Sequence, residues 1–223
     1  MSKPGFRLFI SDCDGVLIDS EILAAHMMVA HLQTFGVTIA LEEYLRTCSG
    51  RTFTDIMTTF SQQYGFELAP DFVEVITQKH ETYSKDHLQA IPGVKEAYAQ
   101  INLPKAVVSN SLLWQVKHAV EFVNMQTVFE DRMFSAEMVA RPKPHPDIYL
   151  HVARQFGLEP AEIIVIEDSK SGAAAAVAAG MHVVGFTGAS HILDDHADKL
   201  LEIGVKQVVH KMEDLPAVVN ALL

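Results

Sequence analysis

The chain has 223 residues, 49% of them hydrophobic, and its 28 acidic and 17 basic side chains give a formal charge of −11. This length allows one large domain or a domain with a smaller insert, and the apolar content suffices for a substantial core. An acidic chain without basic patches argues against nucleic-acid binding, although a local lysine, arginine or metal can still attract an anionic substrate.

Cysteine usage and hydropathy point to a cytoplasmic protein. Cys13 and Cys48 are too few for a disulfide framework, which favours a reducing compartment. The N-terminus lacks the apolar stretch of a signal peptide, and the small apolar run at 173–181 is too short to span a bilayer. We therefore expect no membrane partner, and we expect a monomer.

Short apolar runs in the sequence predict the strands of a parallel sheet that is buried on both faces. These runs are Arg7–Ser11, Lys105–Ser109, Ile163–Glu167, His182–Phe186 and Gln207–Val209. Helical patterns occur at Pro92–Ile101, Leu113–Val123, His145–Phe156 and Ser171–Ala179. Strand and helix alternation predicts an α/β fold, a doubly wound parallel sheet with helices on both faces.

The segment between the first two predicted strands is anomalous, because it is far longer than a strand–helix loop of ~2–6 residues. It shows helical periodicity at Glu21–Thr34, Leu41–Cys48, Thr52–Tyr64 and Pro70–Lys85. We interpret it as an inserted helical subdomain. The predicted boundaries are 1–19 and 88–223 for the α/β core and 20–87 for the insert.

Polar residues follow the predicted strands where those strands end, which is where such sheets bind ligands. They are Asp12 and Asp14 after the first strand, Ser109 and Asn110 at the second, Glu167 and Asp168 at the third, and Lys143 between the last two. Carboxylates suit Mg²⁺, which takes a few of them together with waters and a substrate phosphate. A serine hydroxyl and a lysine ammonium are suited to holding a phosphoryl group.

Each of these residues taken alone has an ordinary structural explanation. Asp12, Ser109 or Asp168 could cap a helix or a turn, and Lys143 could be a solvated surface lysine. Their joint occurrence at strand ends favours chemistry. The carboxylate pair at Asp12 and Asp14 is costly unless a cation or a reaction uses it.

The segment DCDGVLIDS at 12–20 resembles the first motif of the haloacid dehalogenase superfamily, DxDG(T/V)xxDS. Ser109 with Asn110 resembles the second motif, Lys143 the third and Glu167-Asp168 the fourth. The resemblance covers almost the whole chain, and the insert is similar to the family's C1-type cap. The branch that it most resembles contains β-phosphoglucomutase-like and phosphogluconate-phosphatase-like proteins, whose fourth motif is similar to EDSKSGAAAAVAAGM at 167–181.

The resemblance implies a role for each motif residue. Asp12 is expected to be the nucleophile that forms an aspartyl-phosphate, and Asp14 the general acid and base. Ser109 and Lys143 are expected to stabilise the phosphoryl group, with Asn110 beside them in substrate binding. The implied Mg²⁺ ligands are Asp12, the backbone carbonyl of Asp14, and Asp168, with Glu167 as a direct or an outer partner.

Departures from the family's patterns favour a phosphatase acting on a small phosphorylated metabolite, such as a sugar phosphate or sugar-acid phosphate. True haloacid dehalogenases lack the second aspartate, here Asp14. The mutases carry a Lys-Asn pair where this chain has Leu112-Leu113, and a cap histidine where it has Ala24. A phosphomutase remains an alternative. A phospho-accepting signalling module and a silent scaffold on this fold are further alternatives.

Substrate specificity is expected to come from the insert. Within CSGRTF at 48–53, Gly50 would allow a sharp turn and Arg51 would read an anionic or polyol group of the substrate. Trp114, just after the second motif, is expected to pack between helix and sheet, with a place in the cleft as the alternative.

Overall fold

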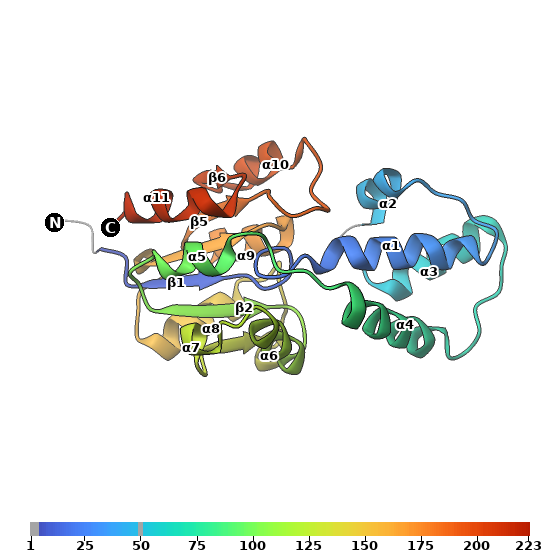
Figure 1. Ribbon diagram of the computed structural model, residues 1–223, viewed down its shortest axis with the longest axis horizontal. Coiled ribbons are helices and arrows are strands. Elements are labelled where there is room, and N and C mark those ends of the chain that lie inside the picture. Colours follow the sequence, from blue (N-terminus) through green and yellow to red (C-terminus); the bar gives the residue numbers. More distant parts are fainter. Residues whose placement is uncertain (1–4, 49–50) are drawn as a thin grey trace. The chain divides into compact units, whose positions relative to one another are not determined.

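The computed structural model describes residues 5–48 and 51–223, and the chain divides into two compact units (Figure 1). The first, called here the core unit, contains the residues up to Ile18 together with Ala90–Leu223. The second, called here the helical unit, is Asp19–Gln89. The helical unit is thus inserted between the first and second strands of the core unit.

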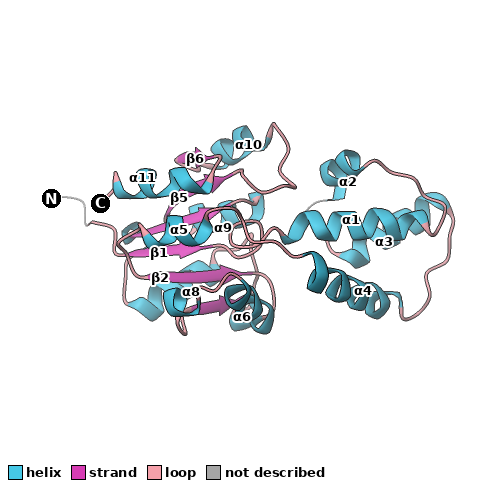
Figure 2. Cartoon of the chain, in the orientation of Figure 1, coloured by secondary structure: helices cyan, strands magenta, loops and turns pink. Residues whose placement is uncertain are grey.

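The core unit contains a parallel sheet, whose strands are magenta in Figure 2. The strand order is β3-β2-β1-β4-β5-β6. This confirms the predicted α/β fold. The strands are β1 (Leu8–Ser11), β2 (Lys105–Ser109), β3 (Met133–Ser135), β4 (Ile163–Glu167), β5 (His182–Phe186) and β6 (Gln207–Val209). Sequence reasoning missed β3, which has three residues, as the predicted strand β6 does.

Helices connect the strands and cover both faces of the sheet. They are α5 (Val94–Ala99), α6 (Leu113–Phe122), α7 (Gln126–Phe129), α8 (Asp147–Phe156), α9 (Lys170–Ala178), α10 (His196–Ile203) and α11 (Leu215–Asn220). Short 3₁₀ turns lie at η1 (Ala136–Met138), η2 (Pro160–Glu162) and η3 (Met212–Asp214). The periodicity of the sequence predicted α5, α6, α8 and α9, whereas α7, α10 and α11 were not predicted.

Strand β1 lies in the middle of the sheet, and its side chains are buried on both faces, as alternation along a strand requires. Leu8 and Ile10 belong to a cluster of buried residues that includes side chains of α8, α9 and α10. On the opposite face, Phe9 meets Tyr98 of α5 edge to face, with ring centroids 5.4 Å apart. Hydrophobic burial on both faces therefore fixes the level at which β1 ends, and with it the position of Asp12.

The helical unit contains α1 (Ser20–Gln33), α2 (Leu41–Cys48), α3 (Phe53–Tyr64) and α4 (Phe72–His87). Its own apolar residues pack together, with Met28, Met57 and Ile76 all fully buried. Helix α3 begins where the Thr52 side chain accepts a hydrogen bond from the Asp55 amide, and it ends at Gly65 in the left-handed conformation. The unit therefore has standard helix ends and a small core of its own.

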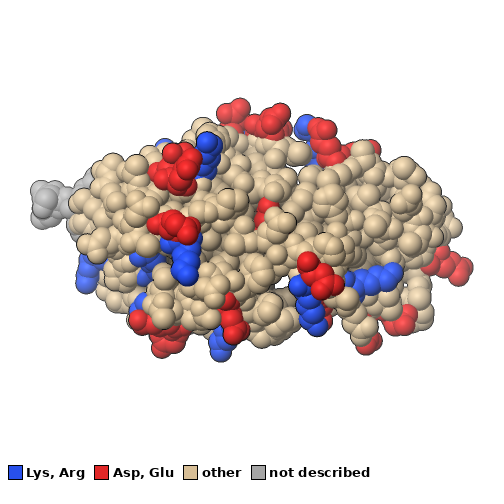
Figure 3. Space-filling view, in the orientation of Figure 1, with Lys and Arg blue, Asp and Glu red and all other residues tan. Residues whose placement is uncertain are grey.

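Charges of both signs are spread over the visible face of the chain (Figure 3). Exposed neighbours form ion pairs such as Arg132–Glu130 at 2.8 Å, a kind of contact that adds little stability because water screens it. None of the described helices is long and apolar enough to cross a membrane.

The core packing predicts that Ile10→Ala destabilises the core unit strongly. Ile10 is fully buried in the central strand, so removing its side chain should lower the free energy of unfolding by about 2–5 kcal/mol. Urea unfolding followed by circular dichroism measures this change. The control is Leu201→Ala, at a residue that is 46% exposed on α10, where we expect a change within about 0.5 kcal/mol. Equal effects at both positions would contradict the assigned core.

Candidate active site

The site is built from the ends of three neighbouring strands. Because β2, β1 and β4 are adjacent and parallel, their carboxyl ends meet at one edge of the sheet. Asp12 follows β1, Ser109 ends β2, and Glu167 ends β4 with Asp168 next in sequence. The Asp12 amide still donates to the Ile166 carbonyl at 3.0 Å, so the backbone hydrogen bonding of the sheet continues into the site.

Lys143 lies at the centre of the site. Its Nζ donates to Asp12 Oδ1 at 2.7 Å, to Glu167 Oε1 at 2.6 Å and to the Val108 carbonyl at 3.1 Å. A lysine ammonium has three N–H donors, so these contacts use all of them. Lys143 and Asp12 are each only 6% exposed and Glu167 is fully buried, which makes this a buried ion triad rather than a surface pair.

Burial and charge act on the pKa values of the triad in opposite directions. For Lys143, burial lowers the pKa, but the Asp12 and Glu167 carboxylates raise it more strongly, so the ammonium stays protonated. For Asp12, burial and the negative charge of Glu167 raise the pKa, and Lys143 opposes them only in part. A cation placed among the carboxylates would oppose that rise, because it would stabilise the ionised form of Asp12.

Asp12, Glu167 and Asp168 each offer a carboxylate oxygen, and these oxygens lie within 4.8 Å of one another. With all three ionised and Lys143 protonated, the group carries two net negative charges, which suits a divalent cation. Hard oxygen donors at this spacing fit Mg²⁺. The described residues are therefore compatible with the predicted magnesium site.

Glu167 differs from the other two carboxylates, because protein donors occupy both of its oxygens. Oε1 accepts from Lys143 Nζ and from the Tyr149 hydroxyl at 2.8 Å. Oε2 accepts from the Ser169 hydroxyl at 3.0 Å and the Ser169 amide at 3.3 Å. These contacts use the capacity of a carboxylate, which accepts about four hydrogen bonds. In this arrangement Glu167 orients Lys143. Asp12 and Asp168 also offer carboxylate oxygens to a metal, and Asp168 Oδ2 lies 3.3 Å from His191 Nε2.

Asp14 is less buried than Asp12 and has different partners. Its Oδ2 accepts from the Ser109 hydroxyl at 3.0 Å and from the Ser111 hydroxyl at 2.8 Å. Sequence reasoning assigned no role to Ser111; its position two residues after Ser109 was the available signal. The two serines hold one carboxylate oxygen of Asp14 in place.

Asn110, which is predicted to bind substrate, contacts the backbone of Lys143. Its Nδ2 donates to the Lys143 carbonyl at 3.2 Å, and its Oδ1 accepts from the Lys143 amide at 3.0 Å. Both side-chain groups of Asn110 are thus engaged with the segment that carries the lysine.

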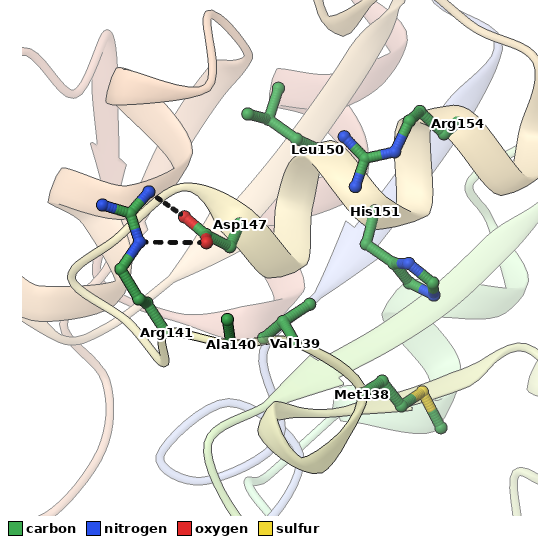
Figure 4. A pocket seen from close by; sticks show the side chains of 8 residues that line it. All are labelled: Met138, Val139, Ala140, Arg141, Asp147, Leu150, His151 and Arg154. Carbon is green, nitrogen blue, oxygen red and sulfur yellow. Dashed lines mark hydrogen bonds and ion pairs between the residues drawn. The ribbon is translucent and has the colours of Figure 1, made fainter.

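An ion pair between Arg141 and Asp147 also holds the segment that carries Lys143. Arg141 donates to both carboxylate oxygens of Asp147, at 3.1 and 2.8 Å, and so ties together the two ends of the loop that contains Lys143 (Figure 4). The two residues belong to the rim of a surface hollow of about 390 Å³. Its other lining residues are Met138, Val139, Ala140, Leu150, His151 and Arg154, so none of the predicted site residues lies in it.

The structure also describes the surroundings of Arg51 and Trp114. The Arg51 guanidinium donates to Thr59 Oγ1 at 2.6 Å and to the Asp55 carbonyl at 3.2 Å, so it is held along α3 within the helical unit. Residues 49–50 of the predicted CSGRTF loop lie outside the described residues. Trp114 is 53% exposed, so the expectation that it packs between helix and sheet was wrong.

Two glycines allow the carboxylates to sit where they do. Gly15 has a φ of +76°, and a Cβ added there would lie 1.8 Å from Asp168 Oδ2. A Cβ at Gly172 of α9 would lie 1.8 Å from Glu167 Oε1. Gly15 belongs to the DxDG motif, but nothing in the sequence pattern indicated the role of Gly172.

Comparison with known proteins identifies the family. Residues 9–186 match the haloacid dehalogenase-like hydrolases. The chain belongs to this family. This confirms the family resemblance found in the sequence motifs, and it identifies the chain as a hydrolase.

Curated relatives in the family carry phosphatase names. The chain is 32% identical over 181 residues to 6-phosphogluconate phosphatase of Escherichia coli, covering 81% of this chain and 82% of the relative. It is 28% identical to hexitol phosphatase A of the same organism, covering 79% and 81%. These relatives support the prediction of a phosphoric monoester hydrolase.

Solved structures agree with the fold. A haloacid dehalogenase-like protein of unknown function from Agrobacterium tumefaciens is 37% identical, with a TM-score of 0.90 and coverage of 97% of this chain and 99% of that one. A family hydrolase from Deinococcus radiodurans, crystallised with phosphate and sodium, is 28% identical, with a TM-score of 0.85 and coverage of 97% and 96%.

The close approach at Gly172 predicts that Gly172→Ala destabilises the protein. In an ordinary helix this change stabilises by about 0.5–1 kcal/mol, because alanine restricts the unfolded chain. Here the new methyl would collide with Glu167, and we expect a loss of about 1–3 kcal/mol in the free energy of unfolding. Denaturant unfolding measures the sign. Gly5→Ala, where a Cβ would meet nothing within 4 Å, is the control; stabilisation by Gly172→Ala would show that Glu167 is not confined there.

Proposed function

We propose that this chain is a Mg²⁺-dependent phosphatase that hydrolyses a small phosphorylated metabolite, such as a sugar phosphate or sugar-acid phosphate, through an aspartyl-phosphate on Asp12. The names of the relatives, 6-phosphogluconate phosphatase and hexitol phosphatase A, support this substrate class. The observation that carries the proposal is the 2.7 Å contact between Lys143 Nζ and Asp12 Oδ1, in a buried site with Asp14 two residues away. This arrangement combines an oriented nucleophile with a nearby proton donor.

In the first step, an Asp12 carboxylate oxygen attacks phosphorus and forms an O–P bond, while the bond from phosphorus to the leaving oxygen breaks. Asp14, protonated at this stage, gives its proton to the leaving alkoxide. Lys143 holds Asp12 in place through Oδ1 and leaves the other oxygen, Oδ2, for attack.

In the second step, Asp14 takes a proton from water, and that water attacks phosphorus. The O–P bond to Asp12 breaks, inorganic phosphate leaves, and both aspartates return to their starting states. Ser111 supports this exchange, because its hydroxyl group holds Asp14 Oδ2 in place.

Asp12 and Asp168, with the backbone carbonyl of Asp14, are proposed to hold the Mg²⁺ ion. When bound, the ion supplies positive charge that offsets the negative charge of the phosphoryl oxygens. Ser109 is proposed to turn its hydroxyl from Asp14 toward a phosphoryl oxygen once substrate is present. Glu167 takes no direct part in metal binding in this proposal, because its oxygens already accept hydrogen bonds from Lys143, Tyr149 and Ser169.

The helical unit is proposed to act as a cap that selects the substrate, within a cytoplasmic enzyme. Arg51 would take part by releasing its contacts to Thr59 and the Asp55 carbonyl, which are exposed contacts to the helix that follows it, α3. An exposed hydrogen bond of this kind costs little to exchange for one to a substrate oxygen.

The nucleophile assignment predicts that Asp12→Asn abolishes phosphate release, by more than ~10³-fold, because an amide oxygen cannot form the phosphoenzyme. Phosphate release from a panel of sugar phosphates measures the effect, with circular dichroism to verify the fold. Asp131→Asn, at an exposed position of the core unit, is the control.

Retained activity in Asp12→Asn would refute the nucleophile. The products also separate the alternatives. An isomeric sugar phosphate without free phosphate would indicate a mutase, and a single stoichiometric phosphorylation without turnover would indicate a signalling module.

The metal assignment predicts that a chelator stops hydrolysis of an aryl phosphate and that added Mg²⁺ restores it. Asp168→Asn should raise the Mg²⁺ concentration needed for half-maximal rate, because it removes one anionic ligand. Initial rates over a range of Mg²⁺ concentrations provide the measurement. Unchanged turnover after complete chelation would remove the metal from the mechanism.

A further inference from the structure

Tyr149 is a buried side chain that the reaction steps do not use. It lies on α8, it is fully buried, and its hydroxyl donates to Glu167 Oε1 at 2.8 Å. Lys143 Nζ lies 5.2 Å from the centroid of its ring. The tyrosine therefore touches both the ammonium and one of its two carboxylate partners, from a helix outside the strand ends that form the site.

Glu167 Oε1 receives two donors, and this divides its negative charge between them. Lys143 Nζ binds it at 2.6 Å and binds Asp12 Oδ1 at nearly the same distance, 2.7 Å. Two carboxylates thus compete for one ammonium group. A donor on Glu167 weakens the pull of Glu167 on that ammonium, since a carboxylate that accepts another hydrogen bond has less charge left to share.

The surroundings give Glu167 no alternative position in which it could relieve this competition. The Ser169 hydroxyl holds its other oxygen at 3.0 Å. The backbone of Gly172 lies so close that even a Cβ there would be 1.8 Å from Oε1. The direction of the Glu167 carboxylate is therefore fixed, and the remaining variable is how strongly it attracts Lys143.

We propose that Tyr149 is a positioning residue for the nucleophile: its hydroxyl offsets the charge of Glu167 so that Lys143 stays engaged with Asp12. This inference rests on the proposed function, because it concerns how the attacking carboxylate is held. It adds a residue from α8 that acts through two others and touches neither substrate nor metal. Without the hydroxyl, Lys143 moves toward Glu167, and Asp12 loses part of its orientation and charge compensation.

The variant Tyr149→Phe removes the hydroxyl and keeps the ring. We expect kcat to fall about tenfold, the order expected for loss of one hydrogen bond to a charged group, with KM unchanged. Tyr98→Phe is the matched control, because Tyr98 is equally buried and its hydroxyl pairs with Ser11 Oγ at 2.6 Å, away from Lys143 and Glu167.

Calorimetric titration with Mg²⁺ alone gives a readout that does not depend on turnover. Without the Tyr149 hydroxyl, less of the negative charge of the site's carboxylates is offset. The Tyr149→Phe variant should therefore bind Mg²⁺ more tightly than the wild type. General damage to the site would have the opposite effect and weaken Mg²⁺ binding. Weaker or unchanged binding would overturn the proposal.

A double-mutant cycle identifies the route through Glu167. Glu167→Gln removes the charge that Tyr149 offsets, so adding Tyr149→Phe to it should cause little further loss in kcat. Additive losses, or a Tyr149→Phe variant that behaves like Tyr98→Phe, would refute the assignment. If the wild type releases no phosphate, the proposed function fails, and the Mg²⁺ titration alone then decides the role of Tyr149.

Discussion

The Lys143 ammonium lies between two carboxylates inside the core unit. Much of the site geometry follows from the need to pair its charge and to provide acceptors for its three N–H groups. A buried charge is tolerated only when it is paired and its remaining hydrogen-bonding groups are used. Asp12, Glu167 and the Val108 carbonyl take the three N–H donors of Lys143. Removing the Lys143 ammonium would leave two buried carboxylates without their cation, and breaking a buried ion pair in this way costs about 3–5 kcal/mol.

The same constraint explains why the loop carrying Lys143 is held so firmly. An ammonium that must reach Asp12 and Glu167 together has little freedom, so its backbone must be fixed as well. Asn110 pairs with both the amide and the carbonyl of Lys143, and Arg141 clamps Asp147 at the other end of the loop. Contacts of this kind fix the backbone of a residue that holds a reacting group. They set the precision of a catalytic site, because small displacements of a reacting group lower the rate strongly.

The sequence allowed the strand ends to be predicted because a parallel sheet obeys simple rules. Apolar runs marked β1, β2 and β4, and the polar residues after them had to meet at one edge. Strand β3 was not predicted, although it has the same three-residue length as the predicted strand β6. Contacts from helices were harder to predict: the direction of Tyr149 and the closeness of Gly172 depend on how α8 and α9 pack, which periodicity does not specify.

Polar contacts in loops and on exposed faces were the least predictable. Asn110 was expected to face substrate, yet its amide is equally suited to a backbone partner, and here it pairs with Lys143. Arg51 has hydrogen-bond acceptors on α3, the helix that follows it. Residue type indicates which bonds a side chain can make, but tertiary structure determines which of them it does make.

The two aspartates of the opening motif show how environment separates the roles of identical side chains. Asp12 is buried and paired with the Lys143 ammonium, whereas Asp14 is more exposed and accepts hydrogen bonds from two neutral hydroxyl groups. A carboxylate fixed by an ammonium serves well as a nucleophile. One that is bound by neutral donors and open to water can exchange protons with a leaving group and then with a water molecule. The repulsion implied by their spacing is therefore limited, because the fold gives each aspartate its own partners.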